Sequence, residues 1–142
     1  MLDEVDLVTG VSGGSFTALA YALYGERLFD IYEDAFLRRD VEGDLLRRLF
    51  NPFNWPQLWT EGFGRSELAA EYYDEILFHG ATYGDLLERS TPRAMAGATD
   101  LTTGGRICFE QGMFDIICAD LTKFRLSRAA AASSAVPVVL RP

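Results

Sequence analysis

Histidine and cysteine are scarce in this 142-residue sequence, which has one histidine, His79, and two cysteines, Cys108 and Cys118. No Cys-x-x-Cys pair occurs, and a single histidine cannot complete a zinc ligand set, so we expect no metal centre. Each cysteine lies in an apolar run, which predicts two buried free thiols rather than a disulfide framework.

Positive charge and long apolar runs are missing as well. The net charge of −8 argues against a general affinity for nucleic acid, and we predict that the pairs Arg38-Arg39 and Arg47-Arg48 are solvated helix surface. No apolar run approaches the roughly 18–20 residues that span a bilayer, and no signal peptide follows Met1. These features leave the cellular location and the oligomeric state open.

What is present is the composition and periodicity of an α/β domain. Hydrophobic residues make up 49% of the chain and charged residues 24%, which argues against disorder. Helical spacing of apolar side chains predicts helices at 15–28, 29–39, 45–50, 67–78, 82–89 and 127–135. β-prone runs predict strands at 2–9, 94–99, 106–110 and 136–142, with a hairpin turn at 102–105.

Helix caps and chain ends add further expectations. Ser66 is predicted to cap the helix at 67–78, and Thr82 and Asp85 are predicted to form a capping box. The first predicted strand is apolar and needs neighbouring strands to bury it, and the last β-prone run stops as it starts. We therefore expect residues 1–142 to be part of a larger domain.

The run Thr9-Gly10-Val11-Ser12-Gly13-Gly14-Ser15 connects the first predicted strand to the first predicted helix. This G-x-S-x-G pattern between a strand and a helix predicts a nucleophile elbow, with Ser12 as the nucleophile of a serine hydrolase. Gly10 and Gly14 are expected to keep Cβ atoms out of the crowded bend. The backbone N–H of Gly13 is expected to face the oxyanion, whose charge the start of the helix favours.

The alternative is a glycine-rich turn that cradles a phosphate or carries out no chemistry. No Gly-Lys-Ser/Thr unit follows and G-x-G-x-x-G is absent, so we expect no nucleotide or other cofactor. A serine nucleophile also needs a base. His79 follows the helix predicted at 67–78, where a histidine is commonly structural. The base is therefore expected beyond Pro142, or it is not a histidine.

Four further segments accompany the elbow in a fixed order: Asn51-Pro52-Phe53-Asn54-Trp55, Phe63-Gly64-Arg65-Ser66, Ala98-Thr99-Asp100-Leu101-Thr102-Thr103-Gly104 and Ala131-Ala132-Ser133-Ser134-Ala135-Val136-Pro137. With these segments the chain resembles the patatin-like phospholipase family, specifically its bacterial members, over nearly its full length. The resemblance implies a three-layer α/β/α lipid acyl hydrolase, with a Ser–Asp dyad and no catalytic histidine. It implies cleavage of fatty acyl esters through an acyl-enzyme on Ser12.

Two motifs of the resembled family do not occur here. In the family the aspartate of the dyad belongs to a D-G-[GA] motif downstream of the last segment, and a G-G-G-x-R-G oxyanion loop precedes the nucleophile strand. Neither is found in residues 1–142. We therefore expect a partial patatin-like catalytic domain that lacks both parts and is inactive or nearly so by itself. Its expected partner is a lipid substrate at a membrane or micelle surface.

Other charged and aromatic residues have simpler interpretations. None of the aspartates is assigned as the base, because turn or surface positions are predicted for Asp100, Asp115 and Asp120. Solvated surface positions are predicted for Arg106, Arg125 and Arg128 rather than contacts with a phosphate headgroup. A cluster of aromatic residues lies in a proline-broken stretch and comprises Phe53, Trp55, Trp59 and Phe63. It is expected to be either a lipid-facing flap or a hydrophobic cap over the sheet.

Three other functions remain alternatives at this stage. An α/β-hydrolase would share the elbow and place an aspartate and a histidine downstream of Pro142. An acyltransferase would use the same serine with an alcohol as the acceptor. A non-catalytic lipid-binding module would keep the turn without the chemistry.

Overall fold

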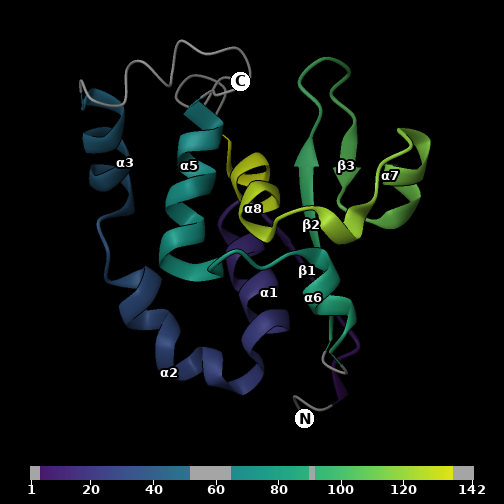
Figure 1. The fold of residues 1–142 in the computed structure, drawn as a ribbon, viewed down its shortest axis with the longest axis horizontal. Coiled ribbons are helices and arrows are strands. Elements are labelled where there is room, and N and C mark those ends of the chain that lie inside the picture. The colour runs from purple at the N-terminus through teal and green to yellow at the C-terminus, as the bar shows by residue number, and fades with distance from the viewer. Residues whose placement is uncertain (1–3, 52–64, 90–91, 136–142) are drawn as a thin grey trace.

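The centre of the fold is a three-stranded mixed sheet, seen in a computed structural model that describes residues 4–51, 65–89 and 92–135 (Figure 1). The strands lie in the order β1 (Leu7–Val11), β2 (Arg93–Thr99) and β3 (Arg106–Cys108). β1 and β2 are parallel, with Leu7 opposite Arg93, and β3 runs antiparallel to β2. The predicted hairpin between the second and third strands is confirmed.

All but one of the helices in the described residues occupy predicted positions, with shifted boundaries. They are α1 (Gly13–Tyr24), α2 (Leu28–Tyr32), α3 (Val41–Phe50), α5 (Arg65–Tyr73), α6 (Tyr83–Leu87), α7 (Gln111–Ile116) and α8 (Leu126–Ser134). Shorter helical turns accompany them, 3-10 at Gly25–Arg27 and Leu121–Lys123 and π at Glu33–Leu37 and Asp74–Phe78. The sequence pattern does not predict α7, because six residues are too few to display a helical period.

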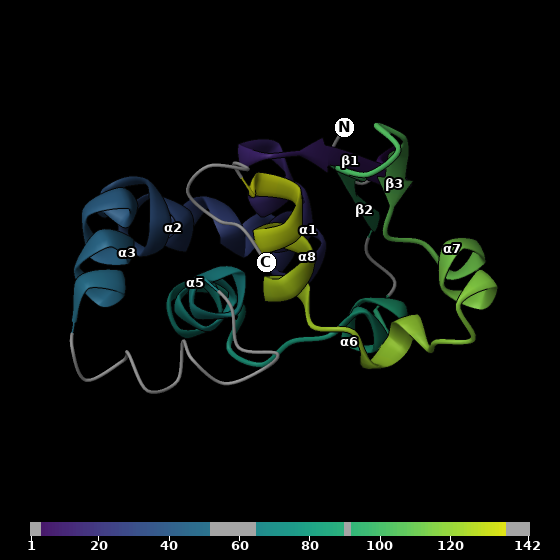
Figure 2. The ribbon, with the colours of Figure 1, turned by 90° about the horizontal axis from the view of Figure 1, so that it is seen from above.

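The core lies where α1, α5 and α8 meet beside the sheet (Figure 2). The apolar stripe predicted for the first helix is buried there, including Phe16, Leu19 and Leu23. The Phe16 ring meets the ring of Tyr73 edge to face, with centroids 4.6 Å apart. Small side chains at Ala129–Ala131 let α8 pack closely against its neighbours. These contacts fix α8 next to the start of α1, where the elbow lies.

The three predicted or observed helix caps have different outcomes. Asp40 accepts a hydrogen bond from the backbone N–H of Gly43, so α3 begins four residues before its predicted start. Ser66 lies inside α5 and is not its N-cap, which corrects that prediction. The capping box at α6 is confirmed, since the backbone N–H of Thr82 donates to the Asp85 carboxylate at 2.7 Å.

β1 is not the buried strand that its apolar sequence predicts. The register places Val8 and Gly10 on the face that α1 covers, whereas Leu7 and Val11, on the opposite face, are 49% and 54% exposed. No helix among the described residues covers that opposite face. The described part of the chain is thus a mixed α/β arrangement with one helical layer on the sheet, and it does not contain the second layer of the predicted three-layer fold.

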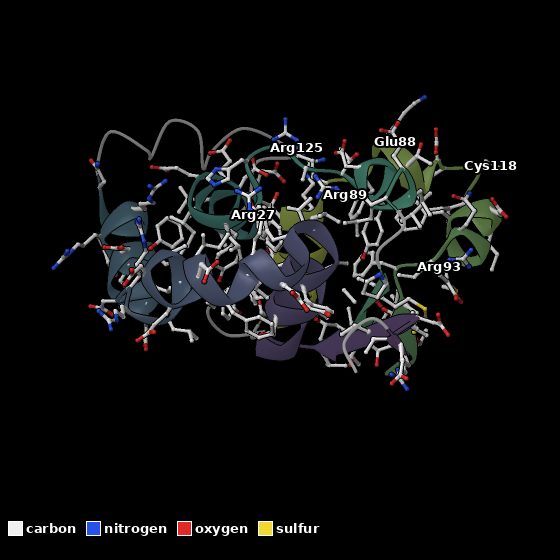
Figure 3. The ribbon with its side chains drawn as sticks, turned by 90° about the horizontal axis from the view of Figure 1, so that it is seen from below. Arg27, Glu88, Arg89, Arg93, Cys118 and Arg125 are labelled. Atoms are coloured by element: carbon white, nitrogen blue, oxygen red, sulfur yellow. The ribbon has the colours of Figure 1, made fainter. Side chains whose placement is uncertain are left out.

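Neither cysteine is fully buried, which corrects the prediction of two buried thiols. Both thiols are free, and Cys108 is half-buried in β3, but Cys118 is exposed. Figure 3 shows Cys118 at the outer edge of the molecule, beyond the end of α7. Its φ of 53° turns the chain out after Ile116 and Ile117, which are themselves exposed. The apolar run before Cys118 therefore does not enter the core, which is why the prediction of burial was wrong there.

Several expectations fall on residues outside the described ranges. These are the strand predicted at 136–142 and the aromatic cluster of Phe53, Trp55, Trp59 and Phe63. Within the described ranges, none of the helices combines the length and the apolar character that crossing a membrane requires.

Candidate active site

Ser12 stands at the sharp turn between β1 and α1, in a backbone conformation that is unusual for a residue with a side chain. Its φ of 54° and ψ of −128° lie outside the left-handed helical region as well as the common regions. Such a conformation costs about 1–3 kcal/mol and persists only where the surrounding structure enforces it. The Ser12 side chain is exposed, and its Oγ makes no hydrogen bond to the described residues.

The glycines of the turn act differently from each other. A Cβ added at Gly10 would lie 2.2 Å from the carbonyl oxygen of Gly14, so only glycine fits at position 10. A Cβ added at Gly13 or at Gly14 would meet nothing within 4 Å in the part of the chain that the structure describes. The expectation that a Cβ would be crowded is therefore right for Gly10 and wrong for Gly14. Gly14 contributes to the crowding through its carbonyl group, which lies where a Cβ of residue 10 would be.

The start of α1 offers free hydrogen-bond donors beside Ser12. At the start of the helix, the Ser15 N–H donates a hydrogen bond to the Ser12 carbonyl oxygen at 3.0 Å. The N–H groups of Gly13 and Gly14 come earlier and have no acceptor among the described residues. An uncapped helix start of this kind favours a developing negative charge.

A residue to which sequence reasoning gave no individual role also touches the elbow. Ser133, near the end of α8, accepts a 2.9 Å hydrogen bond on its Oγ from the backbone N–H of Ser12. The two residues are 121 positions apart in the chain. No local pattern could reveal this contact, because it depends on how α8 packs against the sheet and α1.

The only histidine does not reach this turn. His79 is exposed and ends the π-helical turn after α5 with left-handed dihedral angles, φ 51° and ψ 42°. Two residues later, the Ala81 carbonyl accepts a hydrogen bond from Leu126 at the start of α8, whereas Ser12 bonds near the end of α8. His79 and Ser12 therefore lie toward opposite ends of α8, and the structural interpretation of His79 fits its position.

The aspartates considered as bases are engaged in local structure, as predicted. Asp100 accepts from the Thr103 hydroxyl and the Thr102 N–H, which lowers the pKa of Asp100 below its ordinary value. Asp120 accepts from the hydroxyl and N–H of Thr122, which likewise lowers its pKa. A carboxylate that must take a proton near neutral pH needs a raised pKa instead. The third candidate, Asp115, accepts a hydrogen bond from the Gln111 side chain within α7.

The arginines considered for a phosphate headgroup are surface residues, as predicted. Arg128 pairs with Glu67 of α5 at 2.5 Å, and Arg106 and Arg125 are exposed (Arg125 is labelled in Figure 3). Across the described ranges, no three side chains of histidine, cysteine, aspartate or glutamate are grouped so that they could hold a metal ion.

Comparison with known families decides the affiliation of this chain. The family model described as patatin-like phospholipase matches residues 1–142. The chain belongs to the patatin-like phospholipase family. A search of curated proteins found no match. Membership of this hydrolase family implies a serine hydrolase with a lipid substrate, and it confirms the resemblance drawn from the elbow and the four segments that follow it.

Proposed function

We propose that Ser12 is the nucleophile of a patatin-like lipid acyl hydrolase that cleaves fatty acyl esters of phospholipids or neutral lipids. The Ser12 Oγ attacks the ester carbonyl carbon, the bond to the alcohol oxygen breaks, and the alcohol leaves with the serine proton. Water then cleaves the acyl-enzyme and releases the fatty acid. The observation that carries this proposal is the strained, exposed turn of Ser12 at the uncapped start of α1.

The base in this proposal is an aspartate outside residues 1–142, in a Ser–Asp dyad. No described carboxylate hydrogen-bonds to the Ser12 Oγ, and His79 lies toward the other end of α8. The Gly13 N–H is assigned to the oxyanion, helped by the start of α1. In this proposal residues 1–142 form part of a three-layer α/β/α domain and are inactive or nearly so without the base.

The experiment is labelling of the full-length protein with a fluorophosphonate probe, which reacts with activated serines. We expect labelling and fatty acyl ester hydrolysis that Ser12→Ala abolishes. The matched control is Ser134→Ala, since the Ser134 hydroxyl bonds to carbonyls of its own helix and to Tyr73 of α5. Labelling that persists in Ser12→Ala contradicts the nucleophile assignment.

A second variant tests the absence of a catalytic histidine. His79→Asn introduces a residue that tolerates the left-handed conformation, and we expect this variant to retain the hydrolysis rate of the wild type. A loss of activity at unchanged stability contradicts the dyad.

Transfer of the acyl group to an added alcohol in preference to water would identify an acyltransferase. Lipid binding without probe labelling would identify a binding module.

A further inference from the structure

We propose that Ser133 is a positioning residue, whose hydroxyl holds the backbone of Ser12 in the conformation that exposes the nucleophile. This inference rests on the proposed function of Ser12 and adds a second residue to its site. Ser133 does not touch the substrate in this proposal. It acts through the Ser12 backbone, from a helix that is distant in sequence.

Three hydrogen bonds converge on the Ser133 Oγ, one from each structural element around the elbow. The backbone N–H of Ser12 donates to it at 2.9 Å, the Ser15 hydroxyl lies 2.6 Å away, and the carbonyl oxygen of Gly97 lies 2.5 Å away. Ser12 is in the turn, Ser15 is in α1 and Gly97 is in β2. One hydroxyl on α8 thus joins the turn, the following helix and the neighbouring strand.

The direction of each bond follows from the single proton of the hydroxyl. Ser133 donates that proton to the Gly97 carbonyl, since a carbonyl can only accept. Its oxygen then accepts from the Ser12 N–H and from the Ser15 hydroxyl, which uses both lone pairs. Ser15 is fully buried, so without Ser133 its hydroxyl would lose this partner in the interior.

The location of this hydroxyl matches the point where the sheet is interrupted. β1 ends at Val11, which lies opposite Gly97, and the turn at Ser12 carries the next N–H away from the strand ladder. The Ser133 hydroxyl spans this break, accepting from the Ser12 N–H and donating to the Gly97 carbonyl. It therefore satisfies the backbone groups that the sharp turn separates, and it helps to fix the strained dihedral angles of Ser12.

The test compares Ser133→Ala with Ser134→Ala in the full-length protein. Both variants remove a hydroxyl from the end of α8, but only Ser133 bonds to the elbow. We expect Ser133→Ala to lower kcat for ester hydrolysis about 100-fold with little change in KM, since small misplacements of a reacting group cost that much. Ser134→Ala should keep kcat within about threefold of the wild type.

An isosteric pair separates the hydroxyl from the volume of the side chain. Ser133→Thr keeps the hydroxyl and Ser133→Val replaces it by a methyl group of the same shape. We expect threonine to restore most of kcat and valine to restore none of it. Equal kcat values for the two variants, at equal unfolding midpoints, overturn the positioning role.

A measurement on the wild type needs no variant. The Ser12 amide should exchange its hydrogen about 100-fold more slowly than the free amides of Gly13 and Gly14, because it is bonded to Ser133. Exchange of Ser12 as fast as that of Gly13 overturns the proposal. If Ser12→Ala keeps full activity, the proposed function fails. If Ser12→Ala is inactive and Ser133→Ala keeps full activity, Ser12 remains the nucleophile and the positioning role of Ser133 fails.

Discussion

The backbone of Gly10 lies so close to that of Gly14 that a Cβ built on Gly10 would stand 2.2 Å from the Gly14 carbonyl oxygen. Gly10→Ala must therefore push β1 away from the start of α1. We expect it to lower the free energy of unfolding by about 3 kcal/mol, as for an overpacked core site, or to prevent folding. Chemical denaturation of the full-length protein measures the effect.

Gly14→Ala is the matched control for this change. An added Cβ at Gly14 meets nothing within 4 Å among the described residues, and alanine favours a helix by up to about 1 kcal/mol over glycine. We expect its stability to equal or exceed that of the wild type. Similar losses in both variants would contradict the packing of the turn.

The strain at Ser12 predicts that glycine at this position gives a more stable protein than alanine does. Glycine adopts the dihedral angles of Ser12 without steric cost, whereas alanine does not. Because relief of about 1–3 kcal/mol of strain exceeds the added chain entropy of glycine, about 0.4–1 kcal/mol, Ser12→Gly should be more stable than Ser12→Ala by about 1 kcal/mol. Both variants should be inactive. A less stable glycine variant would show that this backbone carries no strain.

The capping box of α6 predicts a pH dependence of stability. Hydrogen bonds from the Thr82 backbone and side chain hold the pKa of Asp85 below its ordinary value of 3.8. A carboxylate with a lowered folded pKa stabilises the fold above the unfolded pKa, and this contribution disappears as the pH falls through the folded pKa. Asp85→Asn should therefore be less stable than the wild type at pH 7, and the two should converge below pH 3.8.

The size of that difference is bounded by the exposure of Asp85. For a solvent-screened cap we expect about 0.5–1 kcal/mol from denaturation curves at pH 7. Glu88→Gln removes an exposed carboxylate from the end of the same helix (Glu88 is labelled in Figure 3). Glu88 bonds to no described side chain. This substitution should leave the free energy of unfolding at pH 7 within about 0.5 kcal/mol of the wild type, as is usual for an exposed surface substitution. A constant difference between Asp85→Asn and the wild type from pH 7 to pH 2 would contradict the pKa shift.

The two thiols should differ in reactivity because they differ in exposure. Cys118 is exposed beyond α7, whereas Cys108 is half-buried in β3. We expect a maleimide to modify Cys118 at least about 10-fold faster than Cys108 in the folded protein, and equally fast after denaturation. Peptide mapping by mass spectrometry identifies the modified residue. Faster modification of Cys108 would contradict the fold of this region.

Much of the secondary structure could be predicted because its determinants are local. The stripe from Phe16 to Leu23, the box of Thr82 and Asp85, and the hairpin turn before Arg106 each depend on residues a few positions apart. Predictions failed where a distant neighbour decides. Burial of β1 depends on what covers Leu7 and Val11, and their own apolar character does not supply that cover.

The sequence by itself determined the elbow, because glycines at fixed distances from Ser12 permit a turn that few other residues tolerate. It also determined the family, through segments whose order is visible without coordinates. Only the tertiary structure decided that Gly10 and not Gly14 lacks room for a side chain, and that Ser133 bonds to Ser12 across 121 residues. Both depend on distances between packed elements, which a pattern of residue types does not contain.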